Sequence, residues 1–209
     1  MEDIIISVAQ RTLVAGTPLL LGTIGEVLCE RSGILNLGVE GVMSMGAVTA
    51  FIVTLMTNNP WLGLMAAICV GMLISIIHAF ASITLQSNQV VSGLALTMIG
   101  LGVSGLMGKA YVGIPLPVKM NSFAVPLLSD IPYIGPIFFT QSPFFYMAII
   151  LAFVVWFILM HTTIGIKIRA TGENPKATET QGINVSLIKY YCVIIGGGFS
   201  GMAGGNLSL

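Results

Sequence analysis

Long uncharged runs, interrupted by short polar connectors, set the pattern of this sequence. No Asp, Glu, Lys or Arg lies between Glu40 and Lys109, and at about 20 residues per span this stretch could cross a bilayer about three times. Along the whole chain the pattern predicts about six membrane-spanning helices. They are expected near 12–29, 41–57, 61–86, 90–108, 143–161 and from 186 onward. The predicted fold class is an all-α integral membrane protein, with residues 1–209 forming one transmembrane domain.

The N-terminal residues 4–11 are too few to span and mix apolar with polar side chains. They are predicted to form an interfacial helix that leads into the first span. That span contains Pro18 and several glycines. Such breakers persist in membrane helices where neighbouring helices or cavities satisfy the freed backbone groups, so a kink is expected there.

Two longer polar segments separate the later spans. Residues 109–142 hold most of the nine prolines, together with Lys109, Lys119 and Asp130, and are predicted to be a structured loop. Residues 162–185 carry several charges of both signs. Short loops rich in Lys and Arg prefer the cytoplasm, which places 162–185, 30–33 and 86–89 inside and 109–142 outside.

Composition supports lipid as the solvent and removes several classes of function. Only 8% of the residues are charged and 56% are hydrophobic, against about 25% charged in soluble domains. Net charge is zero, so nothing favours nucleic acid as a partner. The three cysteines lack metal-ligand spacing, and phosphate-cradling, zinc-protease and serine-elbow motifs are missing. The chain is expected to hold no metal or cofactor and to catalyse no reaction.

Asn36 and Glu40 are the first candidates for substrate contact. They lie four residues apart between two hydrophobic spans and share one face if the segment is helical. Ionisable groups at membrane depth are costly and usually face a cavity or a partner. A structural role, as a cap or an internal pair in a broken span, explains the same residues.

Polar side chains also gather where the third and fourth spans meet. Asn88, Gln89 and, further along, Thr97 offer amides and a hydroxyl. Such groups could bind a ribose or a base through hydrogen bonds without burying charge. An ordinary polar turn is the equal alternative. His78 and His161 are more simply a packing residue and an interfacial residue.

The segment 172–184 predicts a short amphipathic helix along the membrane surface. Asn174 can cap a helix that starts at Pro175, and Gly182 can end it. A helix of this kind has the shape needed to dock into a groove of a soluble partner. A plain solvated loop is the alternative.

Two runs carry a resemblance to a known family, ERSGILNLGVEGVM at 30–43 and GENPKATETQGIN at 172–184. They resemble the permeases of the ribose and branched-chain amino acid ABC importer superfamily, and the nearest branch is that of the nucleoside and simple-sugar permeases. NQVVSGLAL at 88–96 and IPYIGPIF at 131–138 extend the similarity over nearly the whole chain.

The resemblance implies a permease that imports a nucleoside or a related simple sugar by alternating access across the plasma membrane of a prokaryote. Its partners would be a second permease, same or related, a cytoplasmic ATPase that binds the ATP, and an extracytoplasmic substrate-binding protein facing 109–142. Because the family normally continues with further spans, the chain is expected to be truncated at its C-terminus. A non-ABC channel or a structural membrane protein is the alternative. The residues matching the family's coupling helix are Gly172, Glu173, Asn174, Ala177 and Gly182, and Lys176 between them is expected to take part in coupling.

Overall fold

The computed structural model describes residues 2–118, 120–123 and 134–209, and every regular element in these ranges is helical. Six helices are long and apolar enough to cross a membrane within this described part, which confirms the predicted fold class. They are α1 (Glu2–Arg31), α2 (Val39–Thr57), α3 (Pro60–Ala79, continued by a π-turn over Phe80–Thr84), α4 (Gln89–Gly108), α6 (Pro143–His161) and α9 (Val185–Ser208).

Side-chain caps fix where three of these six helices begin. The Asn59 side chain accepts a hydrogen bond from the Trp61 amide at 3.0 Å, directly before Pro60 opens α3. Asn88 accepts from the Val90 amide at 3.0 Å to open α4, and Asn184 accepts from the Leu187 amide at 3.0 Å to open α9. Short polar side chains at these points satisfy amides that have no partner in the first turn.

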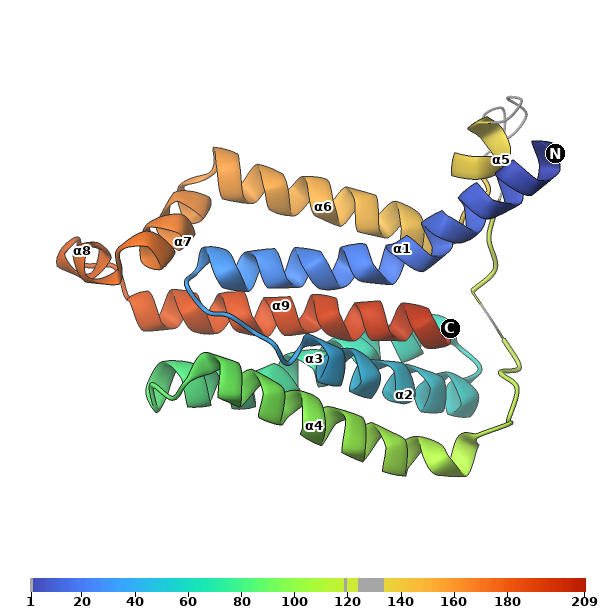
Figure 1. Cartoon of the computed structure of the whole chain (residues 1–209), viewed down its shortest axis with the longest axis horizontal. Helices are drawn as coiled ribbons and strands as arrows, with labels where there is room; N and C mark the ends of the chain where they lie inside the picture. The colour runs from blue at the N-terminus through green and yellow to red at the C-terminus, as the bar shows by residue number, and fades with distance from the viewer. Residues whose placement is uncertain (1, 119, 124–133) are drawn as a thin grey trace.

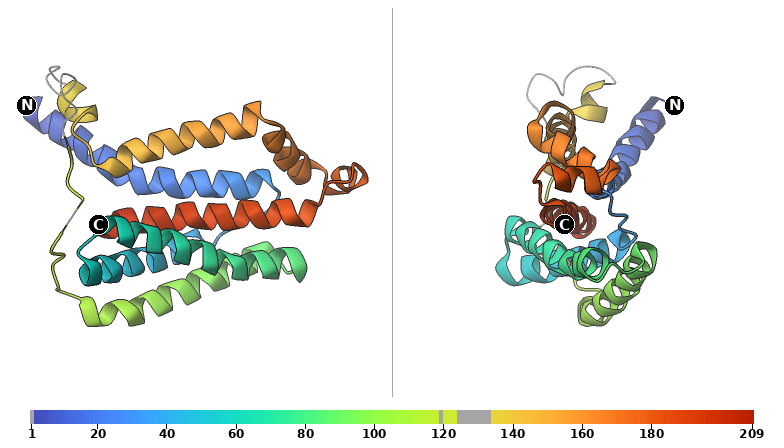
Figure 2. Two further views of the ribbon diagram at one scale, coloured as in Figure 1. Left: turned by 180° about the vertical axis from the view of Figure 1, so that it is seen from behind. Right: turned by 90° about the vertical axis from the view of Figure 1, so that its left-hand side faces the viewer.

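Helix α9 is the centre of the bundle. It packs against α1, α2 and α3, and Figures 1 and 2 show it between a layer of α1 and α6 and a layer of α2, α3 and α4. Glycines let the backbones meet. A Cβ on Gly46 of α2 would lie 2.5 Å from the Gly201 carbonyl oxygen, and a Cβ on Gly71 of α3 would lie 2.9 Å from the Gly201 Cα. Small residues at helix crossings are the usual way to gain packing in lipid.

The N-terminal helix differs from the prediction. Residues 4–11 are the first turns of α1 and not a separate interfacial helix, because the helix runs unbroken from Glu2 to Arg31 through Pro18. The whole Ile4–Arg31 stretch is apolar enough to span. Figure 1 shows α1 bent between its N-terminal turns and the remainder, as expected for a helix that lacks one amide donor.

The polar connectors lie at two opposite ends of the bundle. The end of α1, the turn before α4, and the segment after α6 lie together at one end, whereas both chain termini and the segment after α4 lie at the other (Figure 1). This is the grouping that the charge pattern predicts. The segment 109–142 includes a 3-10 turn (Lys109–Tyr111) and the short α5 (Ile134–Phe138), whereas its residues 119 and 124–133 lie outside the described ranges.

Candidate functional site: an unwound connector, a carboxylate groove and a helical elbow

The connector 32–38 between α1 and α2 starts with a tight helix cap. The Gly33 amide donates to the Glu30 carbonyl at 2.9 Å and the Ile34 amide to the Cys29 carbonyl at 3.2 Å, the bond pair of a Schellman motif. Gly33 has φ +85, a conformation that glycine adopts without strain. Figure 1 shows the connector then turning back toward the middle of the bundle before α2 begins.

Side chains from three helices hold this unwound backbone. Gln89 accepts from the Leu35 amide at 2.8 Å, and Thr97 donates to the Leu37 carbonyl at 2.8 Å. Irregular backbone at membrane depth is tolerated where protein groups satisfy its polar atoms. Glu26 Oε1 accepts from the Asn36 amide at 2.9 Å, and His78 Nε2 lies 3.2 Å from the Leu35 carbonyl oxygen. We call the side chains of Glu26, His78, Gln89 and Thr97 the clasp.

A groove with three carboxylates lies beside the connector. The residues lining it come from α1, the connector and α2 and enclose a cavity of about 370 Å³. Among the described residues that line it there is no Lys, Arg or His. One oxygen of Glu26 is buried without a hydrogen-bond partner. Its polar lining, which we call the carboxylate groove, consists of Thr23, Glu26, Glu30, Asn36 and Glu40.

The structure separates the five predicted substrate residues into three groups. Asn36 and Glu40 line the carboxylate groove together, although the segment between them is not a helix until Val39. The Asn36 oxygen accepts from the Gly38 amide at 3.0 Å, which shapes the connector. Gln89 and Thr97 belong to the clasp, and Asn88 caps α4 and lines a different cavity between α3 and α4.

Sequence reasoning missed Glu26 and Glu30 as groove residues and His78 as part of the clasp. The two carboxylates lie one turn apart near the C-terminal end of a helix whose middle part is apolar. A charge inside a predicted span is itself a signal of a functional site. His78 is 1% exposed, and its Nδ1 lies 3.1 Å from the Ser92 hydroxyl, so the packing role predicted for it includes hydrogen bonding.

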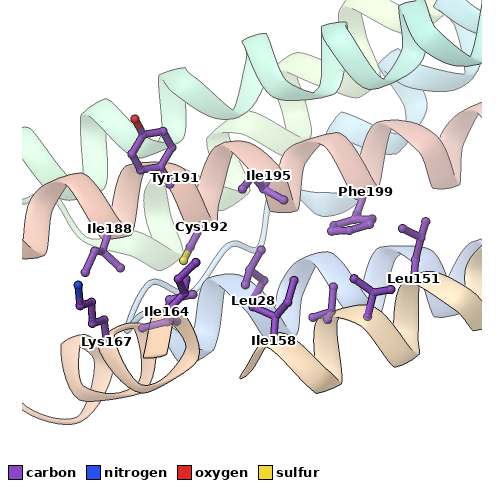
Figure 3. Close-up of a pocket in the computed structure, with 13 residues that line it drawn as sticks. Leu28, Leu151, Ile158, Ile164, Lys167, Ile188, Tyr191, Cys192, Ile195 and Phe199 are labelled. Atoms are coloured by element: carbon purple, nitrogen blue, oxygen red, sulfur yellow. The ribbon is translucent and has the colours of Figure 1, made fainter. Parts of the chain in front are cut away.

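A second cavity, between α1, α6, α7 and α9, is almost entirely apolar. It encloses about 420 Å³ and is lined by aliphatic side chains such as Leu28, Ile168 and Ile195, with Phe199. Figure 3 shows the Tyr191 hydroxyl pointing away from it. A substrate rich in hydroxyl groups would lose its hydrogen bonds to water here without replacement. The carboxylate groove is therefore the better candidate for a polar solute.

The segment 162–185 folds into two short helices that form an elbow outside the spans. Helix α7 (Thr163–Glu173) was not predicted, whereas α8 (Pro175–Thr180) begins where the sequence indicates. The Asn174 side chain accepts from the Ala177 amide at 3.1 Å and so caps α8, and Gly182 has φ +75 just beyond it. Figure 1 shows α8 projecting from the bundle, the place expected for a docking helix.

The predicted coupling residues gather on this elbow. Gly172 and Glu173 end α7, and a cavity of about 320 Å³ opens beside α8. Three of the predicted residues line it: Glu173, Asn174 and Ala177. Lys176 is exposed on α8.

The model of one protein family matches residues 8–209, and its description is "Branched-chain amino acid transport system / permease component". The chain belongs to this permease family. With six candidate spans in its described part, it is a multi-pass membrane protein of that family. The resemblance inferred from the two sequence runs is thereby confirmed.

Relatives within the family carry the names of nucleoside and sugar transporters. The guanosine ABC transporter permease protein NupQ of Bacillus subtilis is 43% identical over 93% of this chain and 64% of its own length. The nucleoside ABC transporter permease protein NupC of Lactococcus lactis is 38% identical over 92% and 64%. TsgC13 of Haloferax volcanii, whose name assigns it to a glucose ABC transporter, is 42% identical over 95% and 61%.

The permease chain thus spans between 61% and 64% of the length of these relatives. No solved structure gives a significant match.

Proposed function

We propose that this permease forms part of the membrane pathway of an ABC importer that moves a nucleoside inward by alternating access. The observation that carries the proposal is the joint presence of a groove lined by three carboxylates among the spans and a capped short helix outside them. The names of the nucleoside-transporting relatives support the substrate class. In this proposal a cytoplasmic ATPase supplies the energy, and a second permease and an extracytoplasmic binding protein complete the transporter.

The chemistry of the groove favours an uncharged solute with many hydroxyl groups. Carboxylate and amide oxygens accept hydrogen bonds from ribose hydroxyls and from base amino groups. Three carboxylates without a basic neighbour in the groove would repel a phosphate. We therefore expect nucleosides to be preferred over nucleotides, with Glu40 and Asn36 as substrate contacts and Glu26 added to them.

The elbow gives the groove a connection to an energy source. Helix α8 lies at the same end of the bundle as the connector and the turn before α4 (Figure 1). We propose that this end faces the cytoplasm, because it carries five of the eight basic residues. ATP-driven closure of the partner ATPases would then move α8 and tilt the spans.

A simple sugar is the second candidate substrate. It is favoured by the 42% identity to the relative whose name assigns it to glucose transport. A hexose offers hydroxyl groups of the same kind as a ribose, and the described residues that line the groove include no aromatic side chain that would stack on a base.

The test is ATP hydrolysis by the assembled transporter. The permease is purified with its ATPase and binding protein, and hydrolysis is measured with adenosine, uridine, ribose or galactose present. Stimulation of ATP hydrolysis by a nucleoside is the expected result. Stimulation only by a sugar would show that the substrate is a simple sugar, the second candidate. Deletion of 174–182 should remove the stimulation while membrane insertion persists. Stimulation that survives the deletion would contradict the coupling role.

A further inference from the structure

At Gly172, the end of helix α7 approaches the end of α1 backbone to backbone. A Cβ on Gly33 would lie 3.1 Å from the Gly172 Cα, and a Cβ on Gly172 would lie 3.1 Å from the Gly33 nitrogen and would overlap the Arg31 carbonyl oxygen. Because no side chain separates the two backbones, there is no soft layer to absorb a displacement. Gly33 lies in the sequence run 30–43 and Gly172 in the run 172–184, so the two glycines are 139 positions apart in the chain.

Both sides of the contact are stiff. On the α1 side, Gly33 lies inside the Schellman motif, and Ile34 packs with Cys29 and Val193 in a buried cluster. On the α7 side, Thr171 is fully buried and the Asn174 amide still donates to the Ala170 carbonyl at 2.9 Å. A push on one backbone therefore moves the other as a body.

Each side also leads directly to a functional part. Two residues after Gly172, Asn174 caps the docking helix α8. Three residues after Gly33, Asn36 lines the carboxylate groove, and its amide donates to Glu26 of the same groove. The path from docking helix to groove is thus short, and hydrogen bonds hold its backbone on each side of the Gly33–Gly172 contact.

We propose that the Gly33–Gly172 contact is the point at which movement of α8 is passed to the substrate groove. The inference rests on the proposed function and goes beyond it, because it assigns the transfer to one contact and not to the bundle as a whole. Gly33 and Gly172 are positioning residues: they touch neither substrate nor ATP. When α8 moves, the cap of α1 moves with it, and the connector shifts Asn36 and Glu26 together.

The test uses Gly172→Ala in the assembled transporter. The added methyl must push the cap of α1 away, which separates the two backbones at this contact and leaves α8 unaltered. Substrate uptake per ATP hydrolysed should fall by about tenfold, within the usual range of coupling energies. Gly102→Ala is the matched control, because a Cβ there meets nothing within 4 Å.

The outcomes separate this inference from the proposed function. If the unaltered transporter takes up no substrate with ATP, the proposed function fails. If it transports and Gly172→Ala retains the uptake-to-hydrolysis ratio of Gly102→Ala, the relay is wrong.

A second measurement keeps the relay testable if Gly172→Ala does not assemble. A fluorophore is placed on Val27→Cys, an exposed site on α1 one turn before the cap, in a Cys69→Ala background that removes the exposed native thiol. Its emission should change when the docked ATPase binds a non-hydrolysable ATP analogue. Unchanged emission in a transporter that is competent for uptake would overturn the relay.

Discussion

Removal of the Thr97 hydroxyl tests whether the clasp holds the connector. Thr97→Val keeps the shape of the side chain but deletes the donor that bonds the Leu37 carbonyl at 2.8 Å. Because the connector is unwound up to Gly38, no backbone amide of a helix replaces the hydroxyl as a donor to the Leu37 carbonyl. This hydrogen bond is exposed at the surface of the described chain, and a carbonyl that faces lipid finds no water to replace its partner. Hydrogen bonds measured within membrane proteins average about 0.6 kcal/mol, with a maximum near 1.7. We therefore expect a loss of about 1 kcal/mol in the free energy of unfolding.

The assay is reversible unfolding of the purified permease in mixed detergent micelles, followed by circular dichroism. Thr12→Val is the matched control. The Thr12 hydroxyl bonds the Val8 carbonyl of its own helix at 2.8 Å and is exposed, so deleting it leaves no group of the connector without a partner. Thr97→Ser should restore most of the loss, because it returns the hydroxyl.

Equal effects of Thr97→Val and Thr12→Val would refute the reasoning. So would a Thr97→Ser variant as unstable as Thr97→Val, since the loss would then come from packing of the methyl group and not from the hydrogen bond.

Further predictions concern the central helix, the docking helix and the groove. Gly46→Ala should destabilise the bundle by about 1–3 kcal/mol because its methyl meets the Gly201 carbonyl. The control is Gly105→Ala, where a Cβ meets nothing within 4 Å. Equal melting temperatures of the two variants in detergent would contradict the prediction. Asn174→Ala should weaken α8 by about 0.5–2 kcal/mol through loss of its cap and lower ATPase affinity in a pull-down, whereas Asn174→Asp should retain binding. Glu40→Gln should raise the KM for uptake with little effect on ATPase docking, and an unchanged KM would remove Glu40 from the proposed substrate contacts.

The spans were predictable because lipid imposes a simple rule on them. An apolar run long enough to cross has few alternatives to a helix, so 143–161 coincides with α6. Local capping chemistry also reads directly from sequence, as the start of α8 after Asn174 shows. The separate interfacial helix at 4–11 was wrong because no proline or glycine divides these residues from the span that follows, and one helix runs on to Arg31.

The candidate site was only partly predictable because its contacts are long-range. Gln89 and Thr97 were recognised as polar residues among spans, but nothing in their own segment shows that they reach back 54 and 60 positions to the connector. Glu26 was missed for the same reason, since its partner is the amide of Asn36 on the far side of an unwound turn. The sequence shows which residues are polar. Only the fold shows which of them hold the connector backbone and which face the groove.

The most direct test of the proposed importer is radiolabelled uptake into vesicles that contain the complete transporter. Uridine, uridine monophosphate and glucose are compared with and without ATP. The account predicts ATP-dependent uptake of uridine and rejection of the phosphorylated compound by the carboxylate groove. Flux that is independent of ATP would contradict the importer and indicate a channel.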